Sequence, residues 1–162
     1  KLMQKESTYI LRTALIVIGS LVAAFLIFAL PSVWTSIPES WAELTTLIHA
    51  IVIAIYLTAI PFYIGLFQTW RLLGFIDRGT AFSEVTVKAL KNIKFCAAII
   101  GAIYIAIVPL LFPIADLDDA PGLLLIGAVI ASAPVVVAIF ASVLEKLLQS
   151  AIDMKKENEL TV

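Results

Sequence analysis

The sequence predicts an all-α integral membrane protein, a four-helix bundle that crosses the bilayer four times. Short polar segments separate four apolar stretches, each long enough to cross the ~30 Å hydrocarbon core at ~1.5 Å per residue. Hydrophobic residues make up 62% of the chain and charged residues 14%, whereas soluble domains have about 45–50% and about 25%. A soluble globule of 162 residues could not bury so much apolar surface, so we expect one membrane domain spanning residues 1–162.

The first span is predicted at about residues 10–30, after a short polar lead. Its apolar run is longer than the ~7–15-residue core of a signal peptide, and no small-residue cleavage motif follows Leu30. We therefore expect a retained helix that reaches Pro31. Residues 31–43 should then form a non-cytoplasmic loop, in which prolines stop helix propagation and Trp34 and Trp41 suit the headgroup level.

The second span is predicted at about residues 44–70, within a helix longer than the bilayer requires. Ser40 and Glu43 have the S-x-x-E spacing of a capping box, which predicts the start of this helix. Gly74 follows the last apolar pair and predicts its C-terminal cap. Pro61 lies inside the helix and should release one backbone hydrogen bond, which favours a kink.

The cytoplasmic turn at residues 71–94 holds five of the eleven basic residues and is the longest polar segment inside the chain. Ser83 is a suitable N-cap, and beyond it apolar residues recur every three or four positions with lysines on the other face. We predict a partner-binding surface here, formed by Asp77, Arg78, Phe82, Ser83, Glu84, Lys88, Lys91 and Lys94. The alternative is a basic fringe of the kind that most membrane helices carry at the cytoplasmic end.

The third span is predicted at about residues 95–113 and ends at two prolines. Small residues four apart allow helices to approach closely, and this span carries such pairs at Ala97–Gly101 and Ala98–Ala102. Similar pairs lie in the first span (Gly19–Ala23) and the fourth (Gly127–Ala131). They permit a homodimer as readily as packing within one chain.

An acidic outer turn follows, with Asp116, Asp118 and Asp119. Three carboxylates could hold a divalent cation, but the glycine and distal glutamate of an EF-hand loop are missing, so no metal site is predicted. Asp119 is instead expected to cap the next helix before Pro121.

The fourth span is predicted at about residues 122–147, and its helix should protrude as a cytoplasmic tail over residues 148–162. Apolar residues continue along this tail with helical spacing, and charges of both signs suit a solvated face. We expect the helix to fray near the KKENE stretch.

The charges also predict the topology. All eleven Lys and Arg residues lie in the N-terminal lead, the central turn and the C-terminal tail, and the two other loops have none. The positive-inside rule then places both termini and the central turn in the cytoplasm of a bacterial cell, with long second and fourth helices extending into it.

The sequence contains no motif that predicts an enzyme or a cofactor site. There is no glycine-rich phosphate loop and no HExxH motif, and the only histidine, His49, has no second ligand one helical turn away. We expect a hydrogen-bonded histidine near the interface. Cys96 is the only cysteine, which excludes an intrachain disulfide and favours a packing role.

The chain resembles a known family in three stretches, FIDRGTAFSEVTVKALKNIKFCA (75–97), ADLDDAPG (115–122) and AIDMKKENELTV (151–162). The family is that of small four-span bacterial membrane proteins catalogued as domain of unknown function 2975, widespread in Gram-positive bacteria. The resemblance implies a fold but no chemistry. Its members are often encoded beside a small helix-turn-helix regulator of the Cro/C1 repressor type.

This neighbourhood suggests that the central turn and tail hold such a regulator at the bilayer, without contacting nucleic acid directly. Two alternatives stay open. A resistance or envelope-stress protein against membrane-active peptides would act through the acidic outer turn. A small-solute transporter or channel would need polar residues lining a path, and the candidates are Tyr56, Tyr63, Gln68 and Tyr104.

Overall fold

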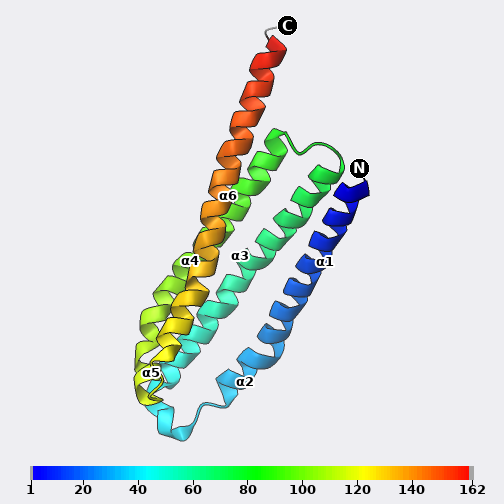
Figure 1. The fold of residues 1–162 in the computed structure, drawn as a ribbon. Coiled ribbons are helices and arrows are strands. Elements are labelled where there is room, and N and C mark those ends of the chain that lie inside the picture. The colour runs from blue at the N-terminus through cyan, green and yellow to red at the C-terminus, as the bar shows by residue number, and fades with distance from the viewer. Residues whose placement is uncertain (1, 161–162) are drawn as a thin grey trace.

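The computed structural model describes residues 2–160, in which four long helical segments run antiparallel to one another (Figure 1). The elements in chain order are α1 (Leu2–Ala24), the π-helical turn η1 (Phe25–Ala29), α2 (Leu30–Thr35), the 3₁₀ helix η2 (Glu39–Leu44), α3 (Thr45–Asp77), α4 (Glu84–Leu110), α5 (Phe112–Leu117) and α6 (Gly122–Leu160). Four segments are long and apolar enough to cross a membrane, which are Lys5–Thr35, Glu39–Asp77, Glu84–Leu117 and Gly122–Leu160. The predicted all-α, four-span architecture is confirmed.

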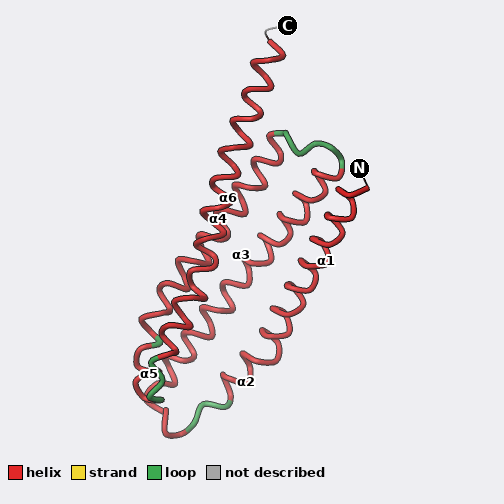
Figure 2. Tube along the Cα trace, in the orientation of Figure 1, coloured by secondary structure: helices red, strands yellow, loops and turns green. Residues whose placement is uncertain are grey.

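The four segments pack in the order α1, α3, α4, α6, and the most extensive contact lies between α4 and α6. The start of α1, the end of α6 and the α3–α4 turn lie at one end of the molecule, called the terminal end below (Figures 1 and 2). The opposite end, called the acidic end, carries η2 and α5. In the most apolar stretch of each of these four segments, at most 22% of the residues are buried inside the protein. This is expected of helices whose apolar side chains face lipid.

The first helix does not end at Pro31, contrary to the sequence prediction, because a π-helical turn carries it past the proline. In this turn the backbone N–H of Leu30 donates to the carbonyl of Phe25, five residues earlier. The carbonyl of Leu26 would then require the N–H of residue 31, and proline has none. The hydroxyl of Tyr56 in α3 donates to the Leu26 oxygen instead, at 2.6 Å. With this carbonyl satisfied, the helix continues as α2 to Thr35.

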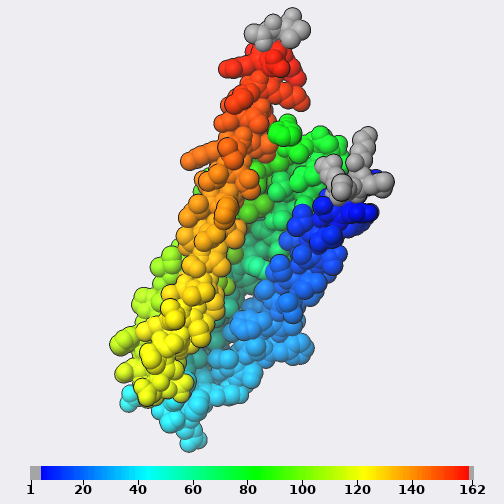
Figure 3. Space-filling model, in the orientation of Figure 1, coloured from blue at the N-terminus to red at the C-terminus, as the bar shows by residue number. Residues whose placement is uncertain are grey.

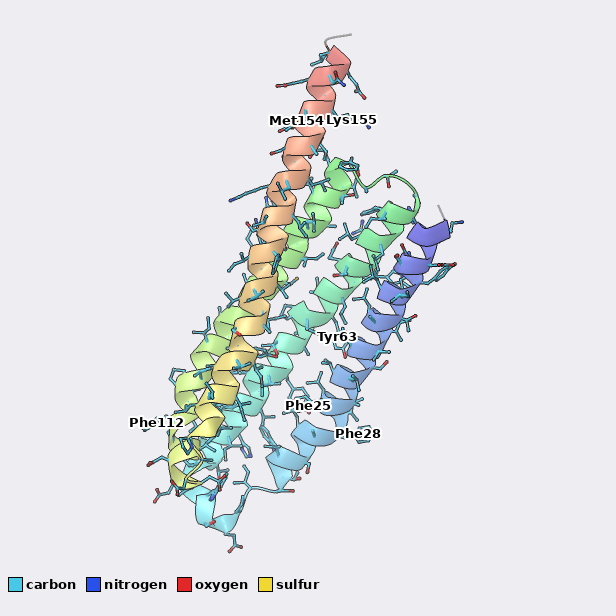
Figure 4. The ribbon with its side chains drawn as sticks, in the orientation of Figure 1. Phe25, Phe28, Tyr63, Phe112, Met154 and Lys155 are labelled. Atoms are coloured by element: carbon cyan, nitrogen blue, oxygen red, sulfur yellow. The ribbon has the colours of Figure 1, made fainter. Side chains whose placement is uncertain are left out.

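A second tyrosine, about two turns further along α3, also holds α1. The hydroxyl of Tyr63 donates to the carbonyl of Gly19 at 2.7 Å, and its side chain points from α3 toward α1 (Figure 4). Gly19 makes this approach possible, since a Cβ there would lie 3.3 Å from the Leu66 side chain. Both α3 tyrosines therefore bind α1 through its backbone.

The ends of α3 and α5 differ from the predicted caps. Gly74 lies inside α3, which ends in a Schellman motif with Gly79 at φ 74° and with the N–H of Thr80 on the carbonyl of Phe75 at 2.9 Å. Asp119, with φ 49°, closes α5 in the same way and does not cap α6. The left-handed position admits aspartate because its short side chain tolerates that backbone conformation.

The predicted helix starts are correct in one case and wrong in the other. Ser40 lies within η2, and α3 begins at Thr45 without a side-chain cap, so the capping box does not form. Ser83 does occupy the N-cap position of α4, but its hydroxyl donates to the carbonyl of Thr80 at 2.7 Å rather than accepting from the helix. At the other end, α6 remains helical through the KKENE stretch to Leu160 and does not fray over the described residues.

Small residues bring α4 and α6 together, which is one of the two roles that their spacing left open. Gly101 is buried, and a Cβ there would lie 3.1 Å from Cγ2 of Val135. A Cβ on Gly127 would lie only 2.6 Å from Cδ1 of Leu111. Gly101 and Gly127 therefore serve contacts within one chain, whereas Ala98 and Ala102 are exposed.

We expect Tyr56→Phe to lower the free energy of unfolding by about 1–3 kcal/mol, the cost of leaving a backbone carbonyl in the hydrocarbon without its donor. The loss should appear as a lower thermal midpoint in detergent or nanodiscs. Tyr9→Phe is the matched control, because the Tyr9 side chain is exposed. Equal midpoints for Tyr56→Phe and the wild type would show that the hydroxyl does not hold α1.

Candidate functional site

The predicted partner-binding surface lies at the terminal end, but one of its residues, Lys94, forms an ion pair inside the bundle. Its ammonium lies 2.7 Å from the carboxylate of Glu145 in α6, and both side chains are mostly buried, at 26% and 18% exposure. The same ammonium lies 5.1 Å from the Phe95 ring centroid. Lys94 therefore joins α4 to α6 and is not available to a partner.

Glu84, the first residue of α4, is likewise engaged within the chain. The Gln149 amide donates to its carboxylate at 3.4 Å, and the ammonium of Lys156 lies 3.5 Å away. Ile152, between these two α6 residues, is 5% exposed. These contacts brace the part of α6 that projects beyond the other helices (Figures 1 and 3).

Asp77, at the end of α3, binds the N-terminal helix. The guanidinium of Arg12 lies 3.4 Å from its carboxylate and stacks over Trp70, 4.7 Å from the ring centroid. This pair adds a third link between α1 and α3, at the terminal end. Arg12 was not among the predicted site residues, because the 65 residues that separate it from Asp77 conceal the contact in the sequence.

The residues that remain for a partner lie on the outward face of α4. Lys88 and Lys91 are exposed, and three-residue spacing places them on one side of the helix. Val85 and Phe95 flank them at 50% and 52% exposure. We call these four residues the lysine face. Within residues 2–160, neither lysine has an ion-pair partner, in contrast to Lys94.

Three other predicted residues lie in or beside the α3–α4 turn. Arg78 and Phe82 are exposed, and Phe82 reaches 63%. The Ser83 hydroxyl also lies 3.3 Å from that of Thr86, so it belongs to a hydrogen-bonded turn rather than to a free surface. The eight predicted residues are therefore not one continuous surface.

At the acidic end, Asp116, Asp118 and Asp119 are all exposed. Over residues 2–160, no group of three or more His, Cys, Asp or Glu side chains could hold a metal ion. His49 stacks on the Trp34 ring, with centroids 3.8 Å apart, and its Nε2 lies 3.3 Å from the Trp34 carbonyl oxygen. The prediction of a hydrogen-bonded histidine is confirmed, and the contact joins α2 to α3.

The three tyrosines proposed for a transport path are not brought together. Tyr56 and Tyr63 bind α1, whereas the Tyr104 hydroxyl lies 3.4 Å from that of Thr58 on the other side of α3. Tyr104 and Cys96 line a cavity of about 370 Å³ between α3, α4 and α6, and its other lining residues are almost all apolar. The cavity is therefore suited to hydrocarbon rather than to a hydrated solute.

Comparison with known proteins gives two matches. The model of the family described as "Protein of unknown function (DUF2975)" matches residues 35–162. The chain is also 46% identical over 160 residues to "Uncharacterized membrane protein YoaS" of Bacillus subtilis (strain 168), with 99% of this chain and 100% of that protein covered. No solved structure matches the chain.

Removing one charge of the Lys94–Glu145 pair should lower the free energy of unfolding by about 1.5–3 kcal/mol, the usual range for a hydrogen bond to a charged group. Glu145→Gln tests this by thermal unfolding in nanodiscs. The exchanged variant, Lys94→Glu with Glu145→Lys, should recover at least half of the loss. If the exchanged variant is no more stable than Lys94→Glu alone, the two side chains do not pair.

Proposed function

This chain belongs to the family described as "Protein of unknown function (DUF2975)", and from that premise we propose that it is a non-enzymatic anchor that binds a helix-turn-helix regulator at the bacterial cytoplasmic membrane. The proposed binding surface is the lysine face of α4 together with Arg78 and Phe82 in the adjoining turn. The terminal end would lie in the cytoplasm. The regulator is the Cro/C1-type protein implied by the family resemblance.

One observation carries the proposal. Among the charged residues around the α3–α4 turn, Asp77, Glu84 and Lys94 have partners within the chain, whereas Lys88 and Lys91 point outward with none over residues 2–160. Exposed apolar residues at 82, 85 and 95 accompany these charges. A cationic stripe flanked by apolar side chains is suited to an acidic protein surface that also carries apolar contacts.

The charge distribution supports the proposed orientation. All the basic residues of the described chain lie at or near the terminal end. The loops of the acidic end contain acidic residues and no lysine or arginine. By the positive-inside rule, the terminal end would face the cytoplasm, where a transcription regulator is found.

The contacts between α4 and α6 suggest how a signal in the membrane could alter the binding of the regulator. The lysine face lies on the same helix as Glu84 and Lys94, both of which bind α6. A change in the packing of α4 against α6 would therefore move Lys88 and Lys91 relative to the α6 tail. Release of the regulator would follow from a shift between two such arrangements.

Lys88→Glu with Lys91→Glu should weaken binding of the purified neighbouring regulator to the protein in nanodiscs by at least tenfold. The binding of the wild type should also fall as salt is raised, because exposed charges are screened. Lys5→Glu with Lys146→Glu is the control, since it makes the same charge change on exposed residues of α1 and α6. Undiminished binding by the α4 variant, or no binding by the wild type, would reject the proposal.

The exposed acidic turn favours a second candidate, protection against cationic membrane-active peptides. Asp116, Asp118 and Asp119 would concentrate such peptides at the acidic end before they reach lipid. Replacing all three with Asn should then abolish the survival advantage of expressing cells under peptide challenge, and Lys88→Glu with Lys91→Glu should preserve it. Equal survival of the Asn variant and the wild type would exclude this role.

A further inference from the structure

The α6 helix is longer than its role in the membrane requires. It has 39 residues, or about 58 Å at ~1.5 Å per residue, against a hydrocarbon core of ~30 Å. Its first charged residue is Glu145, and the last turns project beyond every other helix (Figures 1 and 3). Met154 and Lys155 lie on this projecting part (Figure 4).

One face of the projecting helix is used within the chain. Glu145, Gln149, Ile152 and Lys156 face α4, through the two ion pairs, one amide contact and the burial of Ile152. These residues are spaced by four, three and four, as neighbours along one side of a helix are.

A second apolar stripe lies on the opposite face and has no partner in the described chain. Its residues, also spaced alternately by four and three, are Phe140, Leu144, Leu147, Ala151 and Met154. Phe140, Leu144, Leu147 and Met154 are 65%, 51%, 62% and 67% exposed. Outside the lipid, such exposure of Leu147 and Met154 to water is unfavourable, because apolar surface is more stable when it is removed from water.

The alternation of three and four is that of a coiled-coil heptad. Phe140, Leu147 and Met154 take the d positions, and Leu144 and Ala151 take the a positions. From Glu145 onward the pattern is informative, because most other positions on this part of α6 are polar or charged.

We propose that the projecting part of α6 forms a parallel, two-stranded coiled coil with α6 of a second copy of this chain. Two copies inserted in the same orientation carry their α6 tails out of the same side of the bilayer, so a two-fold axis along the membrane normal places each heptad residue opposite itself. This symmetry makes the seam self-complementary without any further partner. The proposal does not depend on the identity of the regulator.

The flanking charges are compatible with this pairing. In a parallel dimer, the g residue of one helix lies beside the e residue of the next heptad on the other. Here these residues are Ser150 and Lys155, so no like charges meet across the seam at this level. The acids and bases of the inward face stay with their own α4, since they lie on the opposite side of the helix.

The test uses the full chain in its membrane, with Cys96→Ser as the background so that only the introduced thiols react. Leu147→Cys and Met154→Cys should form a dimer-sized disulfide product on mild oxidation, because equivalent d positions meet at the seam within bonding range. Lys146→Cys is the control, an exposed residue off the seam. Its dimer yield should be at least fivefold lower.

A mass measurement provides an independent readout. Light scattering of the detergent-solubilised wild type should give the protein mass of a dimer, and Leu147→Glu with Met154→Glu should halve it. A dimer-sized wild type with cross-linking confined to residues 147 and 154 supports the proposal. A monomeric wild type, or equal cross-linking at 146, overturns it. Regulator binding is not part of either readout, so failure here is distinguishable from failure of the proposed function.

Discussion

The fold depends on the inability of lipid to hydrogen-bond an exposed peptide group, so each backbone carbonyl within the spans must find a partner inside the protein. Pro31, near the end of the first span, has no backbone N–H and so leaves one carbonyl without its usual donor. The π-helical turn moves the defect to the Leu26 carbonyl, and the Tyr56 hydroxyl satisfies it. The Tyr56 side chain of α3 thus supplies the missing hydrogen bond to the first helical segment and determines where the two helices contact each other. Since α1 packs mainly against α3, this contact and the Tyr63 contact decide whether the first span belongs to the bundle.

Some charged residues at the terminal end form ion pairs that join helices, and others are exposed on the surface. Ion pairs at Lys94 and Glu84 join α4 to α6, and the Arg12–Asp77 pair joins α1 to α3. The mostly buried Lys94–Glu145 pair is the strongest candidate for a stabilising contribution, whereas the exposed Lys156–Glu84 pair contributes little in water. Lys88 and Lys91 are not used in this way, which is why the proposed binding surface is smaller than the one expected from the sequence.

The α6 helix connects the two proposals. Its inward face ties it to α4, the helix that carries the lysine face, and its outward face carries the heptad seam. A dimer formed along that seam would present two lysine faces related by a two-fold axis. Helix-turn-helix regulators commonly bind DNA as two-fold dimers, so a symmetric anchor has the geometry to hold both subunits of such a regulator at once. The acidic end, which lies far from the seam, would remain free on each copy.

The sequence by itself determined the four spans, their approximate positions and the separation of basic from acidic ends, because lipid requires long apolar runs and charges cannot lie within them. It also indicated small-residue pairs suited to close helix contact, without deciding whether they meet within one chain or between two. The continuation of the first helix past Pro31 depended on the Tyr56 hydroxyl of another helix, which no local motif encodes. The ends of α3 and α5 are local Schellman motifs at Gly79 and Asp119, and not the caps expected at Gly74 and before Pro121. Only the tertiary structure decided which charged residues remain for a partner, because Lys94 and Glu145 are 51 residues apart and meet only when α6 packs antiparallel to α4.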